Sequence, residues 1–153
     1  MEYIESAQMI ISHVTEGTKL ADKYNLPDVI KEFITTHHGQ GKTKYFYVKY
    51  KNAHPDEEVD DLLFTYPGPN PFTKEQAILM MADTVEAASR SLPDYTEKSI
   101  RELVERLIDA QVAEGYFKDC PITFRDIAYA KTVLIEKLKT IYHTRVSYPE
   151  LKK

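Results

Sequence analysis

Helical spacing of apolar residues is the feature that most restricts the fold of this sequence. Apolar side chains recur three and four residues apart over residues 6–24, 27–36, 74–91, 97–114 and 124–142, as on one face of an α-helix. Thr73, Thr96 and Thr123 stand where N-caps of the last three helices are expected. The sequence has no strand-like alternation, no internal repeat and no glycine-rich phosphate loop. These patterns predict an all-α fold.

The composition is that of an ordinary globular domain and excludes several classes of protein. The 153 residues are enough for one domain with a sizeable core. The net charge of −4 implies no general attraction to a nucleic-acid polymer, so an anionic substrate would need a local positive site such as a metal. The single cysteine, Cys120, excludes an internal disulfide and fits a reducing compartment. No apolar run approaches the ~18 residues of a transmembrane helix, and we expect a cytoplasmic chain.

Two of the five histidines, His37 and His38, are adjacent and follow an amphipathic segment that runs into Gly39. This pattern predicts a helix whose last turn delivers two imidazoles to the start of a loop. Successive helical residues point about 100° apart, so only a helix end can bend both rings toward one point. Neutral imidazole is the commonest protein ligand for a transition metal. A surface pair that suits the helix dipole is the alternative, and this stretch alone leaves both open.

Two further polar residues lie on apolar helices, His13 in the segment 6–24 and Asp83 in the segment 74–91. A lone histidine beside an apolar stripe is more often a core or boundary residue than a ligand. An aspartate inside an apolar helix needs a partner, because an unpaired buried charge is costly. That partner could be an arginine, a capped helix end or a metal. Arg90 lies two turns further along the same helix face and could pair with an anion held near Asp83.

The segment 39–71 has a different character from the rest of the chain. Tyrosines and lysines alternate over residues 42–51, and an acidic run and a proline-rich turn follow. The tyrosines and lysines could form a basic lip over a phosphate site. The alternative, which we favour, is a short helix with its aromatic side chains on the core and its lysines in water. We expect His54, in the most polar part, to be solvated.

Several motifs in fixed order resemble the HD-domain metal-dependent phosphohydrolases. These are an isolated His13, then His37-His38-Gly39, then Asp83 within Met81-Ala82-Asp83-Thr84-Val85-Glu86-Ala87-Ala88. Together with Lys44-Tyr45-Phe46-Tyr47, Tyr66-Pro67-Gly68-Pro69 and the tail from His143 to Pro149, they are similar to one branch, the cytoplasmic HD domain of the seven-transmembrane-helix HD family. Members of that branch hydrolyse cyclic di-AMP. The resemblance covers nearly the whole chain and implies an HD-domain-like helical bundle.

The resemblance also implies a centre of two divalent transition metals, usually iron or manganese, that activates water for attack on a phosphodiester. His13, His37 and His38 match ligands of one metal, and Asp83 matches a ligand of the other. Gly39 matches the turn after the histidine pair. We expect Arg90, Lys44, Tyr45 and Gly39 to take part in substrate binding.

One departure from the family pattern changes these expectations. No histidine in the sequence is followed by aspartate, so the dipeptide whose aspartate bridges the metals in the family is absent. We therefore expect residues 1–153 to be the C-terminal part of a single HD domain, incomplete at its N-terminus. The intact parent, anchored in the plasma membrane, would bind two metals, and this chain one or none, with weak activity or none. Uncovered apolar surface would favour a homo-oligomer.

Two other functions remain open on sequence grounds. The chain could be a degenerate HD domain that binds a nucleotide or a protein partner without catalysis. It could also be a helical interaction module in which the histidines are structural. Metal content would separate these alternatives, since an interaction module should purify without stoichiometric metal.

Overall fold

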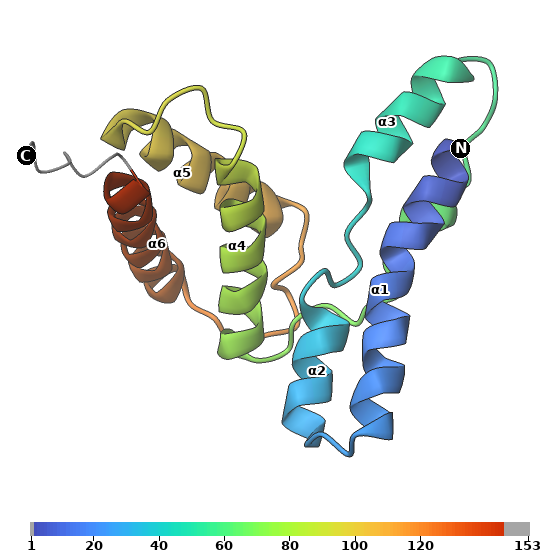
Figure 1. Ribbon diagram of the computed structural model, residues 1–153, viewed down its shortest axis with the longest axis horizontal. Coiled ribbons are helices and arrows are strands. Elements are labelled where there is room, and N and C mark those ends of the chain that lie inside the picture. Colours follow the sequence, from blue (N-terminus) through green and yellow to red (C-terminus); the bar gives the residue numbers. More distant parts are fainter. Residues whose placement is uncertain (1, 146–153) are drawn as a thin grey trace, which may run out of the picture. The chain divides into compact units, whose positions relative to one another are not determined.

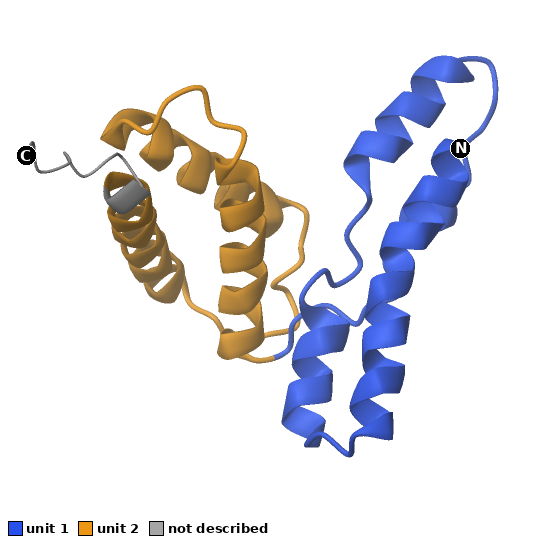
Figure 2. Cartoon of the chain, viewed as in Figure 1, with its two compact units in different colours: residues 1–72 blue, residues 73–153 orange. Residues whose placement is uncertain are grey.

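The structure, a computed structural model, describes residues 2–145 (Figure 1). Within that range its named elements are all helices, as predicted, and one isolated bridge joins Lys42 to Thr65. The structure divides into two compact units, residues 1–72 and 73–153 (Figure 2). Unit 1 contains α1 (Tyr3–Lys23), α2 (Asp28–Thr36), α3 (Lys44–Ala53) and the 3-10 helix η1 (Asp61–Phe64). Unit 2 contains α4 (Lys74–Ser89), α5 (Glu97–Ala113) and α6 (Phe124–Arg145). The single-domain organisation expected for residues 1–153 stays a prediction.

Unit 1 is built on a hairpin of α1 and α2, which lie side by side in Figure 1. The turn between them places Asn25 at φ 54°, and Pro27 fixes the entry into α2. Gly17 allows the two helices to approach closely, because a Cβ atom at this position would lie 3.1 Å from Cγ2 of Ile34. The Lys31 ammonium lies 2.8 Å from the Asp22 carboxylate and ties α2 back to α1. The close approach of α1 and α2 at Gly17 sets the spacing of the side chains on the facing sides of the hairpin.

The segment 39–71 contains the predicted short helix, α3, which packs on α1 and η1. Tyr47 and Tyr50 contact the fully buried ring of Phe64, as expected for aromatic side chains on the core. Tyr45 differs, since it lies on the opposite side of the helix and is 66% exposed. The prediction of a solvated His54 is wrong: its ring is half-buried, stacks on Tyr50 and bonds through Nδ1 to the Tyr50 carbonyl oxygen (3.0 Å).

Unit 2 begins with the predicted capping box. The Gln76 N–H donates to the Thr73 hydroxyl oxygen (3.2 Å), and the Thr73 N–H donates to the Gln76 side-chain oxygen (3.3 Å). Thr96 caps α5 and Thr123 caps α6, as expected. The core lies among α4, α5 and α6 and consists of apolar side chains at helical spacing: Ala77, Met80, Met81, Val85, Ile100, Val104, Ile108, Ile127, Ala130, Ile135 and Leu138.

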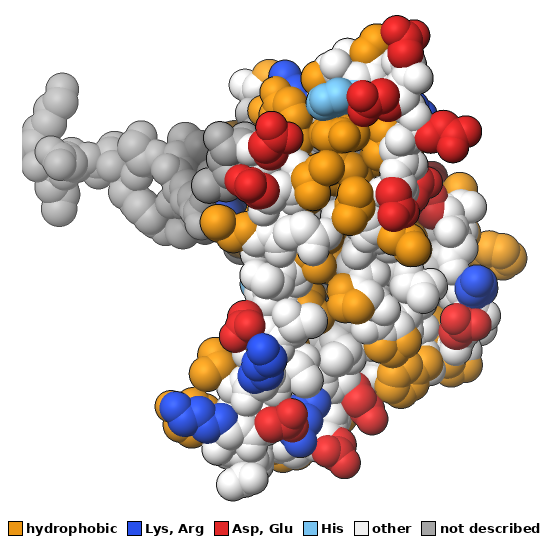
Figure 3. All heavy atoms as spheres, turned by 90° about the vertical axis from the view of Figure 1, so that its right-hand side faces the viewer, with side chains coloured by type: hydrophobic (Ala, Val, Ile, Leu, Met, Phe, Trp, Pro, Cys, Tyr) orange, Lys and Arg blue, Asp and Glu red, His pale blue; other side chains and the backbone are white. Residues whose placement is uncertain are grey.

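Several apolar side chains stay exposed on unit 1. Met9, Ile10 and Leu20 of α1 and Val29 and Ile30 of α2 are all exposed, and Figure 3 shows hydrophobic side chains interspersed with acidic and basic ones over one face of the molecule. Within residues 2–145 no helix is long and apolar enough to cross a membrane.

Candidate metal centre

Three imidazoles converge in unit 1, one from the middle of α1 and two from the end of α2. α2 ends at Thr36, which is fully buried, and His37 is its C-cap. Gly39 takes φ 49° and donates its N–H to the Thr36 carbonyl oxygen (2.9 Å), which turns the chain sharply after the histidine pair. One nitrogen from each of His13, His37 and His38 lies within 4.8 Å of the others. The helix end therefore does bring both rings of the pair toward one point.

Backbone carbonyls fix the orientation of two of these rings. The Nδ1 of His13 lies 2.5 Å from the Ile10 carbonyl oxygen, and the Nδ1 of His37 lies 2.6 Å from the Ile34 carbonyl oxygen. A carbonyl oxygen only accepts, so each Nδ1 carries the hydrogen and donates it. In the neutral ring Nε2 then presents a lone pair, which is the tautomer that a metal ligand requires.

The two Nε2 atoms of His13 and His37 lie only 3.1 Å apart. Two lone pairs at that distance repel each other unless a cation lies between them, either a shared proton or a metal. For a metal with nitrogen ligands at about 2.1 Å, two ligands at a right angle lie about 3.0 Å apart, and at the tetrahedral angle about 3.4 Å. The observed separation therefore matches that of two ligands on one transition metal.

His38 is held by an aromatic contact that sequence reasoning missed. Its ring stacks on Tyr66, with centroids 4.5 Å apart and an interplanar angle of 15°. Tyr66 is buried, and its N–H donates to the Gly41 carbonyl oxygen (2.8 Å), which joins the proline-rich turn to the loop after the histidines. Tyr66 also meets the His13 ring edge-on (5.9 Å). The signal available in the sequence was the Tyr66-Pro67-Gly68-Pro69 motif, which carries this ring.

The donor set fits a divalent transition metal. Three imidazoles suit zinc, iron, copper or nickel better than calcium or magnesium, which prefer oxygen ligands. His13 is exposed, whereas His37 and His38 are half-buried, so solvent or substrate can reach the cluster from the α1 side. The histidines of the cluster can thus hold a metal and leave positions open for other ligands.

Two other predicted site residues, Asp83 and Arg90, lie in unit 2: Asp83 is on α4 and Arg90 is its C-cap. Asp83 is half-buried. Arg90 is bound by Glu86, with Nε–Oε1 at 3.0 Å and a terminal nitrogen 2.6 Å from Oε2, and this contact raises the pKa of the guanidinium. Arg90 is therefore already paired within its own helix. The joint action of Asp83 with the histidine cluster stays a prediction.

Sequence reasoning also missed a buried amide that bonds to Thr84, the residue after Asp83 in the sequence. The Gln111 side chain on α5 donates from Nε2 to the Thr84 hydroxyl oxygen (3.0 Å), while its Oε1 has no hydrogen-bond partner within the described residues. Only 7% of Gln111 is exposed. The contact links α5 to the turn of α4 that carries Asp83.

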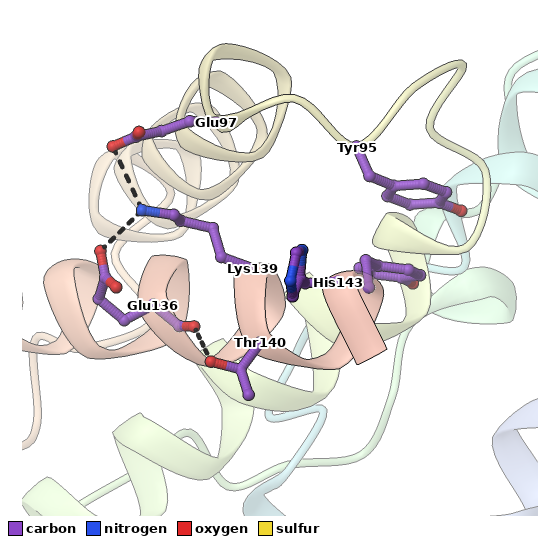
Figure 4. Close-up of a pocket in the computed structure, with 7 residues that line it drawn as sticks. Tyr95, Glu97, Glu136, Lys139, Thr140 and His143 are labelled. Carbon is purple, nitrogen blue, oxygen red and sulfur yellow. Dashed lines mark hydrogen bonds and ion pairs between the residues drawn. The ribbon is translucent and has the colours of Figure 1, made fainter. Parts of the chain in front are cut away.

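Lys44 and Tyr45, predicted to bind substrate, are both exposed on α3, and Gly39 is buried in the turn after the histidine pair. A separate cavity of about 420 Å³ lies in unit 2, where Lys139 stands between Glu97 (3.6 Å) and Glu136 (3.3 Å), beside His143 and the stacked rings of Tyr95 and Tyr142 (Figure 4). None of the predicted site residues lines it.

Comparison with solved structures identifies the fold. The chain is similar to the HD domain of the Listeria monocytogenes phosphodiesterase PgpH, with a TM-score of 0.86 and 34% sequence identity over 94% of this chain and 66% of that one. A second structure of that domain, in complex with cyclic di-AMP, gives a TM-score of 0.88 and 35% identity over 93% of this chain and 65% of that one. No family model matches the chain.

The chain therefore belongs to the HD-domain phosphohydrolases, as the order of its motifs predicted. Among full-length proteins it is 36% identical over 148 residues to the cyclic-di-AMP phosphodiesterase PgpH of Bacillus subtilis, and 37% identical over 146 residues to that of Listeria monocytogenes. These alignments cover 97% and 95% of this chain, which spans about a fifth of the length of either relative (20%). The family implies a divalent metal. The part of the tail resemblance from Val146 to Pro149 lies outside the described residues.

Proposed function

We propose that this chain carries the histidine side of the metal centre in a phosphodiesterase domain that hydrolyses cyclic di-AMP. The observation that carries the proposal is the pair of Nε2 atoms on His13 and His37, 3.1 Å apart with both Nδ1 atoms turned to carbonyl oxygens. The relatives named cyclic-di-AMP phosphodiesterase, and the solved HD domain in complex with cyclic di-AMP, support this substrate.

In this proposal His13, His37 and His38 hold one divalent metal, iron or manganese, and Asp83 contributes to a second. When bound, the metals supply Lewis-acid stabilisation of the phosphodiester and lower the pKa of water. The chain itself contributes orientation: the carbonyl oxygens of Ile10 and Ile34 fix two imidazole tautomers.

The remaining predicted site residues are proposed to bind the substrate rather than the metal. Arg90, Lys44 and Tyr45 hold the phosphates of the dinucleotide, and Gly39 gives the backbone room to approach it. Loss of Arg90 or Lys44 should therefore weaken substrate binding more than turnover, because neither side chain is needed to activate the attacking water.

We further propose that residues 1–153 form the C-terminal part of a longer HD domain, cytoplasmic in location, whose parent is anchored in the plasma membrane. The sequence has no His-Asp dipeptide, so the carboxylate expected between two metals is missing from it. The chain alone should then be inactive or weakly active. Exposed apolar side chains of α1, such as Met9 and Leu20, favour a homo-oligomer.

The test compares this chain with a longer form that is extended upstream to include a His-Asp dipeptide. Both are assayed on cyclic di-AMP and cyclic di-GMP with added manganese or iron. We expect negligible hydrolysis by the short chain and conversion of cyclic di-AMP to the linear dinucleotide by the long one. His38→Ala and Asp83→Ala should each remove most of the long form's activity while its helical circular dichroism stays unchanged. Robust turnover by the short chain would overturn this account of the site.

The absence of the His-Asp dipeptide favours one second candidate, a degenerate HD domain that binds the nucleotide without hydrolysing it. Calorimetry with cyclic di-AMP separates the two, because the degenerate domain would bind the dinucleotide in both forms and hydrolyse it in neither.

A further inference from the structure

One face of α3 presents apolar and basic side chains together to solvent. Lys44, Tyr45, Val48, Lys49 and Asn52 are all exposed, with Tyr45 at 66% and Val48 at 51%. Their spacing of one, four, five and eight residues from Lys44 places them on one side of the helix. We call these five residues the outer face of α3. It contains an aromatic ring and a β-branched side chain between two lysines.

The opposite side of α3 packs on the rest of unit 1. Tyr47 and Tyr50 contact the buried Phe64 ring at centroid distances of 5.6 Å, and α3 packs against α1 and η1. The Lys42 ammonium lies 4.6 Å from the centre of the Tyr47 ring. With this side fixed, Tyr45 and Val48 cannot turn inward to bury themselves, so they remain available to a partner.

The charge of the outer face is positive although the whole chain carries −4. Residues 42–51 contain four lysines and no acidic residue. Asp61 of η1 lies on the inner side, where Lys42 binds it at 2.9 Å and, with the Tyr47 hydroxyl, lowers the pKa of its carboxyl group. Lys49 instead lies beside the Tyr45 ring, 5.7 Å from its centre. Positive charge and exposed apolar area thus coincide on one helix face.

We propose that the outer face of α3 binds the surface of a bilayer that contains anionic phospholipid. The lysines meet the phosphate groups, while the Tyr45 ring and the Val48 side chain enter the boundary between headgroups and acyl chains. A nucleic-acid polymer fits less well, because the basic area is confined to one short helix of an acidic chain and carries an aliphatic side chain at its centre. This inference does not depend on the proposed phosphodiesterase activity, and it gives Lys44 and Tyr45 a second ligand besides the substrate.

Tryptophan fluorescence tests the proposal directly, because the sequence contains no tryptophan. Tyr45→Trp places a single reporter on the outer face. Tyr24→Trp is the matched control, since Tyr24 is equally exposed at 66% and also lies beside a lysine, Lys23, 5.5 Å from its ring centre. On vesicles of phosphatidylglycerol and phosphatidylcholine we expect a blue shift for Tyr45→Trp only, and none on phosphatidylcholine alone. No shift, or an equal shift for both variants, would overturn the proposal.

Charge removal provides the second test. Lys44→Gln/Lys49→Gln should weaken co-sedimentation with phosphatidylglycerol vesicles about 30-fold, at about 1 kcal/mol per lysine. Lys19→Gln/Lys23→Gln, on exposed positions of α1, removes the same charge and should have a much smaller effect. Equal losses in the two double variants would show that net charge alone acts. A Tyr45→Trp signal that responds to cyclic di-AMP but not to vesicles would assign the face to the nucleotide and overturn the membrane proposal.

Discussion

Replacing Gly17 by alanine tests whether helix spacing sets the geometry of the histidine pair. Gly17 lies one turn after His13 on α1, and its neighbour across the hairpin, Ile34, lies about one turn before His37 on α2. A Cβ atom at residue 17 would lie 3.1 Å from Cγ2 of Ile34. The same approach of the two helices brings Nε2 of His13 to 3.1 Å from Nε2 of His37.

Two opposing free energies decide the effect on stability. Alanine in a helix interior is favoured over glycine by about 1 kcal/mol. Against this, carbon atoms pack best at about 3.5–4.0 Å, so a 3.1 Å contact forces the helices apart, and overpacking of this kind costs about 1–3 kcal/mol. We therefore expect Gly17→Ala to lower the free energy of unfolding by about 0–2 kcal/mol. Because the imidazoles move apart with the helices, metal affinity should fall about tenfold, as when a group that orients a ligand is lost.

The assay combines urea unfolding followed by circular dichroism with calorimetric titration of manganese or zinc. Thr15→Ala is the control, because residue 15 is exposed on the same helix and the substitution gains helix propensity. It should be neutral or slightly stabilising and leave metal affinity unchanged. If Gly17→Ala raised stability by the full propensity gain and bound metal as tightly as the parent chain, the contact with Ile34 would not set the histidine geometry.

Further predictions follow from single contacts. His37→Ala should abolish metal binding, which we expect to be weak and to involve one metal per chain; elemental analysis that finds two tightly held metals would contradict this. Gln111→Leu should keep or raise the free energy of unfolding in urea, because it removes a buried oxygen without a described partner, whereas Gln111→Ala should lower it by about 2 kcal/mol through the cavity it leaves. The Thr123 N–H and the Lys74 ammonium lower the pKa of Asp126 to about 2. A lowered pKa stabilises the fold above the unfolded-state value near 4, and this contribution disappears as the pH falls toward 2. Asp126→Asn should thus destabilise the chain at pH 7 and make little difference once the pH is below 2, as thermal unfolding under both conditions would show.

The helices and their starts were predictable because their determinants are local. The Thr73 and Gln76 side chains bond reciprocally across three residues, and the Thr96 and Thr123 caps act over the same short distance. Pro27 likewise fixes the start of α2 through its own backbone geometry. The ends were less well predicted: α4 ends at Ser89 rather than residue 91, and α6 continues to Arg145 rather than ending at residue 142. Helix ends fray, and their bounds vary by one or two residues with the criterion used to assign them.

The side of α3 that faces the core could not be derived from the sequence. Residues 45, 47 and 50 are all tyrosines, and their neighbours in the sequence are nearly the same. Their exposure is decided by Phe64, which reaches α3 from η1 and takes Tyr47 and Tyr50 as partners. His54 was expected to be solvated because its neighbours in the sequence are polar. Its ring stacks on Tyr50, a contact that exists only because α3 continues up to Ala53.

The histidines and Asp83, the two parts of the predicted metal site, differ in how much of their arrangement follows from the sequence. The orientation of His13 and His37 depends on carbonyls three residues earlier in the same helix, Ile10 and Ile34, so it follows from local helix geometry. Their meeting depends on contacts between the two helices, among them the close approach at Gly17 and the ion pair of Lys31 with Asp22. The α4 side of the predicted site also depends on a contact between helices, because Thr84, next to Asp83, accepts a hydrogen bond from Gln111 of α5, which the sequence did not single out. The three histidines therefore come from one helical hairpin, and a metal bound there should depend on the packing of α1 against α2 and on Tyr66, whose ring stacks on His38.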